Sequence, residues 1–594
     1  MSESLTKEAR AAEAAGRKRG VAEIVSVLDE PARGLVLEVV KRTRLRRKEK
    51  RRVAAELVGH FEDGVAGGES LEGLVKRFGE PVVVARLIRR AQKRQRGLLW
   101  KMWGVSWKGV VCFLVLYVAA GMYLATGRAV VEVDYASMLL EGAESIEGDD
   151  RAWPLYREAA MGLGDEPEFG GETEGWQSIS NIREGSVYWG DAAAYIEAHE
   201  IELGLIREGA KRSGMGYSPR QLEDEDLSYF GFRKEDEYDS SKGMIEGSML
   251  GMMLPHAGEL RQLVRVMAFD ARKAAVEGDG DRVVADLEAM IAMGGHARDI
   301  PVLICDLVGL AVDGLTIEVF MEVLSERPDV ISNEGLLRLA HVFAGLDDRF
   351  ELRMNGERLG FYDLLQRMYT PGDDGYLVGS LAVLGGENEL LKLDAEYGSL
   401  LAKVGRVGAL PAVTLMMASR GEVEAEYDRY MDRMVSAFSR PMWEWEKDIE
   451  AEELDFERNR LQKMRYLPMA IMVPSIRSAG EVFKRSETKR DAMLVAVALE
   501  LYKRRHGGWP ASLDELVPGL LPEVPRDPYT GEGLGYVVGE DGRPIVYSVG
   551  RDGDDDGGRW AAHPNDGVLR PYVARESVFS EEVPDGDWGL WPVE

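Results

Sequence analysis

An uncharged apolar run after residue 108 constrains this chain more than any other feature of its sequence. The run, GVVCFLVLYVAAGMYLAT, extends from 109 to 126. At about 1.5 Å per helical residue its length is about 27 Å, close to the hydrocarbon thickness of a bilayer. Trp100, Trp103 and Trp107 precede it, and aromatic rings favour a membrane interface. The pattern predicts a transmembrane helix over residues 105–127, with a buried core helix as the alternative.

Charge is distributed unequally on the two sides of this run. The 594 residues carry a net charge of −29. Residues 1–108 hold 25 Lys and Arg against 14 Asp and Glu, a net of +11, which leaves −40 for the remainder. Positive flanks stay in the cytoplasm. The asymmetry therefore predicts a single-pass protein of the inner cell membrane, with a cytoplasmic N-terminus, an extracytoplasmic C-terminal domain and the lipid bilayer as a partner.

Changes in composition and the positions of turn-forming residues divide the chain into several parts. We expect a mainly α protein: a disordered N-terminus (1–19), a basic cytoplasmic helical module (20–100), the transmembrane helix (105–127), a large helical ectodomain (128–480), a small α+β module with an acidic loop (484–560) and a C-terminal tail (561–594). Only two cysteines are present, Cys112 and Cys305, and only the second lies beyond the apolar run. No disulfide can therefore brace the expected ectodomain.

The N-terminal module has apolar residues at helical spacing, such as Leu35, Val39, Val53, Leu57 and Phe61. Its basic run, KRTRLRRKEKRR, suits a solvated face beside anionic lipid, and no nucleic-acid partner is expected.

The stretch 56–88, ELVGHFEDGVAGGESLEGLVKRFGEPVVVARLI, resembles the short helical domains that precede membrane spans in many bacterial proteins. The matching residues are His60, Asp63, Arg77, Gly79, Pro81 and Ala85. The resemblance implies a regulatory or docking module without chemistry of its own.

The expected ectodomain, 128–480, is helical by pattern, and its short connections imply antiparallel neighbours. Two segments, AWPLYREAA and ERLGFYDLLQRMYTPGDDGYL, resemble uncharacterised exported helical proteins of planctomycete-type bacteria, which implies no activity. The Met-rich stretch GMIEGSMLGMMLP is either an adaptable binding surface or filler in a helical core. Walker, H-E-x-x-H, G-x-S-x-G and C-x-x-C motifs are missing from the sequence, so no catalytic residue is assigned.

The module at 484–560 has a distinct order of elements. Ser486 is a candidate N-cap for a helix that ends in KRRHGG. Two strand-like segments follow, GLGYVV and PIVYSV, joined by GEDGR, whose Asp-Gly is a hairpin turn signal. The glycine-rich acidic loop SVGRDGDDDGG, residues 548–558, comes directly after the second strand.

This order resembles the globular part of the major type II secretion pseudopilin, the G type. The matching residues are Tyr502, Gly508, Trp509, Pro510, Leu513, Leu516, Pro525, Asp527, Pro528, Tyr536, Tyr547, Ser548, Gly550, Asp552, Gly553, Gly557 and Gly558. Trp509 replaces the family's Tyr, and Val549 replaces its Leu. Because the apolar run lies far upstream of this helix, we do not expect the chain to polymerise as a pilus subunit.

The acidic loop is a candidate calcium site. Ca²⁺ takes six to eight oxygens from carboxylates, carbonyls and water, and glycines let a backbone turn tightly enough to supply them. The pseudopilin resemblance implies the Asp552 carboxylate and the Val549 carbonyl as ligands. Local spacing adds Asp554 and Asp556. The alternative is a solvated turn without a metal.

These patterns predict a membrane-anchored envelope protein with a structural or protein-interaction role, related to secretion if the pseudopilin resemblance extends to function. Its partners among envelope proteins are not specified by the sequence. A transmembrane regulator or sensor is the alternative, and an exported hydrolase is a third.

Overall fold

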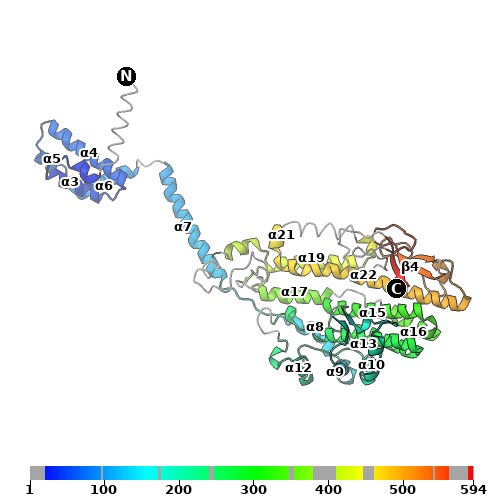
Figure 1. Cartoon of the computed structure of the whole chain (residues 1–594). Helices are drawn as coiled ribbons and strands as arrows, with labels where there is room; N and C mark the ends of the chain where they lie inside the picture. Colours follow the sequence, from blue (N-terminus) through cyan, green and yellow to red (C-terminus); the bar gives the residue numbers. More distant parts are fainter. Residues whose placement is uncertain are drawn as a thin grey trace. The chain divides into compact units, whose positions relative to one another are not determined.

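The computed structural model of this chain describes residues 20–94, 98–171, 175–239, 247–346, 354–378, 408, 410–445, 460–539, 542–550, 552–560 and 586–592. The described residues are mainly helical, which confirms the prediction of a mainly α protein. They belong to two compact units, Met1–Ala119 and Ala120–Glu594, which Figure 1 shows with helices as ribbons.

The first unit is a small helical domain with a core of its own. Its helices are α2 (Val21–Val25), α3 (Ala32–Arg42), α4 (Arg47–Ala66), α5 (Leu71–Arg77) and α6 (Pro81–Arg94). Val36, Val53 and Phe61 are buried between them. Of the predicted apolar positions, Leu35 and Leu57 pack against this core.

The residues of the N-terminal resemblance have structural roles in this unit. Gly79 has a φ of +88°, a conformation that favours glycine, and Pro81 begins α6 directly afterwards. Ala85 is buried, and Arg77 forms an ion pair with Glu69. The His60 ring lies edge-on to Phe61, 5.9 Å between centroids. These contacts stabilise the turn between α5 and α6 and the helices on either side of it.

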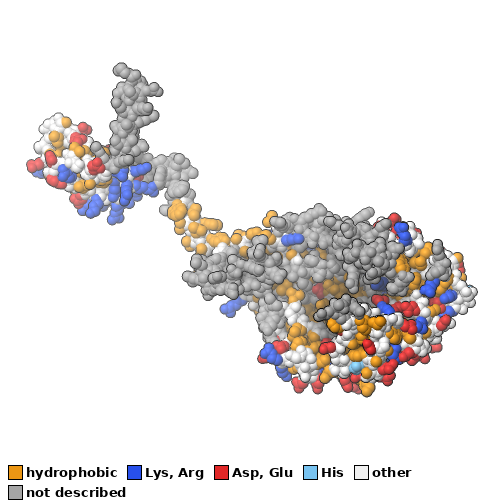
Figure 2. All heavy atoms as spheres, in the orientation of Figure 1, with side chains coloured by type: hydrophobic (Ala, Val, Ile, Leu, Met, Phe, Trp, Pro, Cys, Tyr) orange, Lys and Arg blue, Asp and Glu red, His pale blue; other side chains and the backbone are white. Residues whose placement is uncertain are grey.

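Basic side chains gather on the visible face of the first unit (Figure 2). Arg86, Arg90, Lys93 and Arg94 of α6 are exposed to solvent. Their positions agree with a solvated basic face.

Helix α7 (Leu98–Leu124) contains most of the apolar run, and the division between the units falls within it. In the part of the chain that the structure describes, no helix combines enough length and enough apolar residues to cross a membrane. The helix ends at Leu124, before a turn at Ala125 and Thr126. Its uncharged part is therefore about 24 Å long, less than the hydrocarbon thickness of about 30 Å.

The predicted transmembrane helix over 105–127 is thus wrong. The single-pass topology and the inner-membrane localisation, with a cytoplasmic N-terminus and an extracytoplasmic C-terminal domain, were derived from that helix and are wrong with it.

The described part of the second unit is built mainly from helices. In chain order they are α8 (Tyr135–Glu144), α9 (Trp153–Leu163), α10 (Trp189–Ala198), α11 (Glu200–Gly209), α12 (Asp224–Phe230), α13 (His256–Glu277), α14 (Gly280–Ala297), α15 (Leu303–Glu326), α16 (Asn333–Ala344), α17 (Met354–Met368), α19 (Arg420–Phe438), α21 (Arg460–Arg465) and α22 (Leu467–His506). Short 3₁₀ segments lie between several of them: η1 (Gly148–Asp150), η2 (Ile179–Asn181), η3 (Lys234–Asp236), η4 (Met249–Gly251), η5 (Pro328–Val330), η8 (Met442–Glu444) and η9 (Leu513–Leu516).

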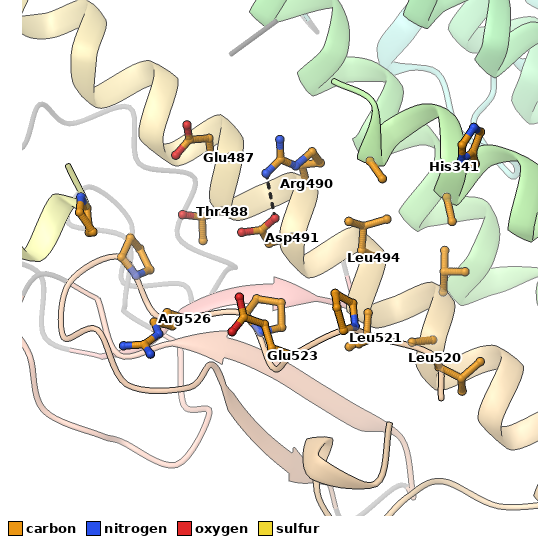
Figure 3. A pocket seen from close by; sticks show the side chains of 18 of the residues that line it. His341, Glu487, Thr488, Arg490, Asp491, Leu494, Leu520, Leu521, Glu523 and Arg526 are labelled. Atoms are coloured by element: carbon orange, nitrogen blue, oxygen red, sulfur yellow. Dashed lines mark hydrogen bonds and ion pairs between the residues drawn. The ribbon is translucent and has the colours of Figure 1, made fainter. Parts of the chain in front are cut away.

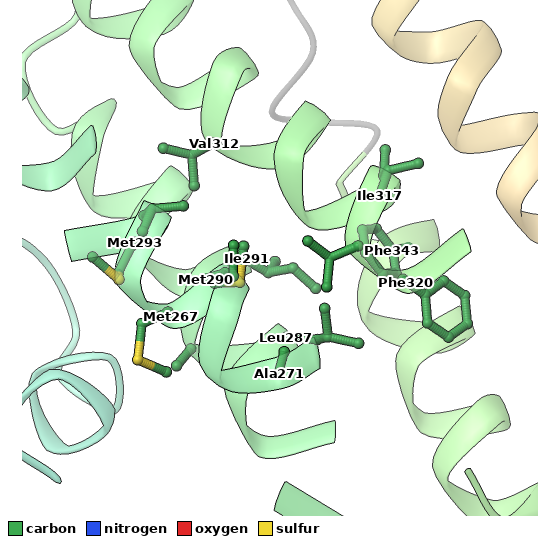
Figure 4. Close-up of a cluster of buried hydrophobic side chains, with 14 of the residues drawn as sticks. Met267, Ala271, Leu287, Met290, Ile291, Met293, Val312, Ile317, Phe320 and Phe343 are labelled. Carbon is green, nitrogen blue, oxygen red and sulfur yellow. The ribbon is translucent and has the colours of Figure 1, made fainter. Parts of the chain in front are cut away.

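Helices α13, α14 and α15 form the centre of this unit and pack against one another in chain order. Figure 4 shows Met267, Leu287, Met290 and Phe320 converging between them. Gly278, in the left-handed conformation, ends α13, and Asp279 then caps α14 by accepting a hydrogen bond from the Arg282 N–H at 3.0 Å. This short connection between two helices agrees with the helical pattern expected of this region.

Helix α22 continues across the predicted start of the C-terminal module. Its 40 residues include Ser486, which is inside the helix, so the predicted N-cap is wrong. Val495 and Leu499 of α22 belong to the same buried cluster as the centre of the helical body. Arg504 also donates to Asn333 Oδ1 at 2.7 Å on α16. The helical body and the C-terminal module therefore share one core.

Two small sheets complete the second unit. The predicted hairpin is confirmed: β3 (Gly535–Val538) pairs antiparallel with β4 (Pro544–Ser548). A third strand, β5 (Trp588–Trp591), pairs with the other edge of β4, although the sequence suggested only a tail there. A separate hairpin, β1 (Glu168–Gly171) with β2 (Gly175–Ser178), was not predicted.

Candidate functional site

The acidic loop begins where β4 ends, and hydrogen bonds to a buried aspartate fix its base. Asp527 is almost fully buried, at 1% exposure. Its Oδ1 accepts from the N–H of Tyr529 at 2.8 Å, and its Oδ2 accepts from the N–H of Val549 at 2.8 Å. Gly550 follows with a φ of +79°, which turns the chain away from the strand. Val549 is thus held at the start of the loop, and a ligand role for its carbonyl stays a prediction.

The structure brings the three predicted aspartates together. One carboxylate oxygen each of Asp552, Asp554 and Asp556 lies within 4.8 Å of the other two. Asp552 and Asp554 are exposed, whereas Asp556 is half-buried. Three carboxylates at this separation repel one another unless a cation or protons compensate their charge. The cluster can therefore supply three oxygens to a metal ion.

The fourth aspartate of the loop points to other partners. Asp555 Oδ1 accepts from the Tyr547 hydroxyl at 2.9 Å and from the Gly557 N–H at 2.9 Å. Asp555 therefore closes the turn against β4, in contrast to its neighbours Asp554 and Asp556.

Burial and mutual repulsion shape the electrostatics of the cluster. Partial burial raises the pKa of Asp552, and the charges of Asp554 and Asp556 raise it further. The Gly586 N–H, which donates to Asp552 Oδ2 at 3.1 Å, acts in the opposite direction. Asp556 Oδ1 pairs with Arg559 at 3.0 Å, while its Oδ2 is buried with no hydrogen-bond partner among the described residues. That oxygen is available to a cation.

Sequence reasoning missed a second buried carboxylate beneath the loop. Asp587 has no exposed surface and accepts from the N–H groups of Gly558, at 2.7 Å, and Asp556, at 3.3 Å. Burial raises its pKa, and the charges of Asp555 and Asp556 add to the shift. Asp587 lies in the predicted tail, directly before β5, where no local pattern connected it to the loop. The short segment PDGDW, which contains Asp587, was the only sequence signal for this residue.

A groove of about 860 Å³ lies near this module, between α16, α22 and the loop 519–528 (Figure 3). Leu494 of α22 faces Leu521 of the loop across it. Four of its charged residues pair along α22: Lys484 with Glu487 at 2.8 Å, and Arg490 with Asp491 at 3.1 Å. These pairs are typical of a helix surface, and they supply no nucleophile with an adjacent base.

Three histidines of the helical body have packing roles. Burial lowers the pKa of His256 to about 3, so its ring is neutral, and it lies 4.2 Å from the Tyr217 ring between centroids. His296 shares a hydrogen bond of 2.9 Å with the Tyr156 hydroxyl. His199 follows α10 and bonds to the Tyr195 carbonyl at 2.8 Å. Aromatic and backbone contacts of this kind orient a helix and need no substrate.

Comparison with known proteins gives no match for this chain among protein-family models, curated proteins or solved structures. The resemblances drawn from short motifs therefore stay predictions.

Proposed function

We propose that the C-terminal module binds one Ca²⁺ ion through Asp552, Asp554 and Asp556, with the Val549 carbonyl as a further ligand, and that the protein has a structural or protein-interaction role. The observation that supports the proposal best is the convergence of the three carboxylates within 4.8 Å. Hard oxygen ligands on a glycine-rich loop suit Ca²⁺, which accepts flexible coordination.

The residues present fit such an ion. The buried Asp556 Oδ2 without a hydrogen-bond partner among the described residues is the kind of oxygen that a cation satisfies. A bound ion would supply positive charge to carboxylates that otherwise repel one another. This chain's own contribution is to hold the loop: Asp527 fixes its start and Asp587 its end.

A structural role agrees with the position of this loop. Its residues bond to Asp527 before β3, to Gly586 beside β5 and to Tyr547 on β4, so an ion there would connect all three strands of the sheet. The resemblance to the pseudopilin calcium module supports the same interpretation from the sequence.

Calorimetric titration of calcium into the full-length chain, after treatment with chelator, tests the proposal. The full chain is required because α22 shares its core with the helical body. We expect saturable binding of one ion. Asp554→Ala should abolish most of the binding heat, because it deletes a ligand.

Asp555→Asn is the matched control, one residue further along the same loop. It removes a negative charge but keeps the Oδ1 that accepts from Tyr547 and Gly557, so calcium binding should persist. Equal loss of binding in both variants would mean that general negative charge, and no defined site, attracts the ion. No calcium heat in the unsubstituted protein would identify the loop as a solvated turn.

A further inference from the structure

Helix α6 of the first unit has two faces of different character. On its inner face, which packs against α3, Ala85 is buried and Ile88 contacts the core of the unit. The outer face follows residues spaced four, three and four apart along the helix, which places them in one stripe. These are Val83, Leu87, Arg90 and Arg94, and all four are exposed.

The outer face of α6 is strongly basic (Figure 2). The helix, PVVVARLIRRAQKR, contains no Asp or Glu. Four of its basic residues are exposed, and none of the four has an ion-pair partner among the described residues: Arg86, Arg90, Lys93 and Arg94. Their positive charges are therefore available to an anionic partner.

The basic run that stands out in the sequence, KRTRLRRKEKRR, is different in this respect. Acidic residues one helical turn away compensate part of its charge. Arg42 pairs with Glu38 at 2.7 Å, and Arg52 pairs with Glu56 at 3.1 Å. The structure thus directs attention from that run to α6.

Two apolar side chains lie on the same outer face as the arginines. Val83 is 49% exposed and Leu87 is 59% exposed, and they are one helical turn apart. A single exposed apolar residue is common on a protein surface. Two adjacent ones among unpaired arginines form a surface that is both basic and apolar.

We propose that the outer face of α6 binds the surface of an anionic phospholipid bilayer. A helix that lies in the headgroup region buries its apolar side chains toward the acyl chains, while Arg and Lys side chains extend to the phosphates. Val83 and Leu87 provide the apolar contact here, and the arginines beside them provide the ionic contact. This contact is made at the surface of a bilayer and requires no membrane-spanning helix.

The combination of charge and apolar surface favours lipid over other anionic partners. Nucleic acid attracts basic residues through its phosphates, but it gains nothing comparable from Val83 and Leu87. The same face of a second copy would bring like charges together. An anionic bilayer offers negative headgroups and an apolar interior in one place.

A dye on α6 tests the proposal in the full-length chain. NBD, which emits more strongly and at shorter wavelength outside water, is attached to Val83→Cys after the exposed Cys112 has been replaced by Ser; Cys305 is buried. Vesicles of phosphatidylcholine with about 30% phosphatidylglycerol should shift the emission, because basic residues are attracted to anionic headgroups. Vesicles of phosphatidylcholine alone should not, and added salt should reverse the shift.

Substitutions on α6 separate the two kinds of contact. Arg90→Gln should weaken vesicle binding about fivefold, the contribution of one basic residue near an anionic surface. Leu87→Gln should weaken it about threefold or more, because less apolar area is buried. Arg47→Gln, at an exposed position of α4 with no ion-pair partner among the described residues, is the control for charge. Val27→Gln, at a side chain that is 66% exposed, is the control for apolar area.

Both control variants should bind as the unsubstituted chain does. Since all four positions are exposed, the urea midpoints should not change. Equal emission shifts with the two kinds of vesicle, no shift with either, or equal weakening by Arg90→Gln and Arg47→Gln would overturn the proposal. A shift without vesicles that grows with protein concentration would assign the face to a second copy. A shift with duplex DNA that Leu87→Gln leaves unchanged would assign it to nucleic acid.

Discussion

Arg298 and Asp313 form a fully buried ion pair between α14 and α15: the Arg298 Nη2 donates to Asp313 Oδ2 at 2.6 Å, and neither side chain is more than 1% exposed. The pair lies where the two helices pass close together. Cβ atoms added at Gly294 or Gly309 would overlap the Asp313 carboxylate or the Arg298 guanidinium. Two glycines thus make space for two charges.

Removing one partner of this pair should destabilise the protein strongly. Asp313→Ala leaves the Arg298 charge buried without its carboxylate, and such losses typically cost about 3–5 kcal/mol. Urea unfolding measures the change. The surface pair Arg338–Glu288, whose side chains are 57% and 28% exposed, provides the control, because Glu288→Gln should cost less than about 1 kcal/mol. Similar losses of unfolding free energy in the two variants would show that burial does not determine how much an ion pair contributes to stability here.

Two glycines of α17 should respond oppositely to the same substitution. Gly356→Ala places a methyl group against the carbonyl oxygen of Pro301, a backbone atom that cannot rotate away, so we expect destabilisation of about 2 kcal/mol or more. At Gly360 nothing lies within 4 Å of the added Cβ, and Ala should stabilise the helix by about 0.5–1 kcal/mol. Thermal unfolding of both variants checks the difference in sign.

Calcium should stabilise the protein by mass action. At a free concentration one hundred times the dissociation constant, one bound ion adds about 2.7 kcal/mol to the free energy of unfolding. Differential scanning calorimetry with calcium and with chelator measures the shift. Magnesium should give a smaller shift, because it demands stricter geometry than a flexible loop provides. A larger shift with magnesium would contradict the assignment of the ion.

Stability should fall with rising pH because of Asp286, which is buried on α14. Its Oδ1 accepts from Arg207 Nε at 2.6 Å, while its Oδ2 has no hydrogen-bond partner among the described residues. Burial raises its pKa, and the charge of Asp270 raises it further.

The folded state therefore binds this proton more tightly than the unfolded state, whose reference pKa is about 3.9. The contribution to stability is complete below that value and is lost as pH rises through the raised pKa, by up to about 1.4 kcal/mol per pH unit. Urea unfolding between pH 4 and 8 should show the loss, and Asp286→Asn should reduce its slope. Asp281→Asn, at an exposed position of the same helix, should leave the slope unchanged.

Short-range patterns predicted the elements whose determinants lie within a few residues. The Asp-Gly signal located the hairpin of β3 and β4, and the spacing of the loop aspartates brought Asp552, Asp554 and Asp556 together. The same reasoning failed for the predicted transmembrane helix. The apolar run extends to residue 126, whereas helix α7 ends at Leu124. It also failed at Ser486, a good capping residue that tertiary packing holds within α22.

The sequence by itself determined the mainly helical fold, the hairpin and the crowding of carboxylates after β4, since helix periodicity, turn chemistry and charge spacing act between near neighbours. Only the tertiary structure decided that Asp527 and Asp587 fix the two ends of the acidic loop, that β5 completes the sheet, and that α22 shares its core with the helical body. Each of these contacts joins segments that the chain separates by several turns or elements. Their formation depends on which surfaces the shared core buries together, and no local pattern encodes that choice.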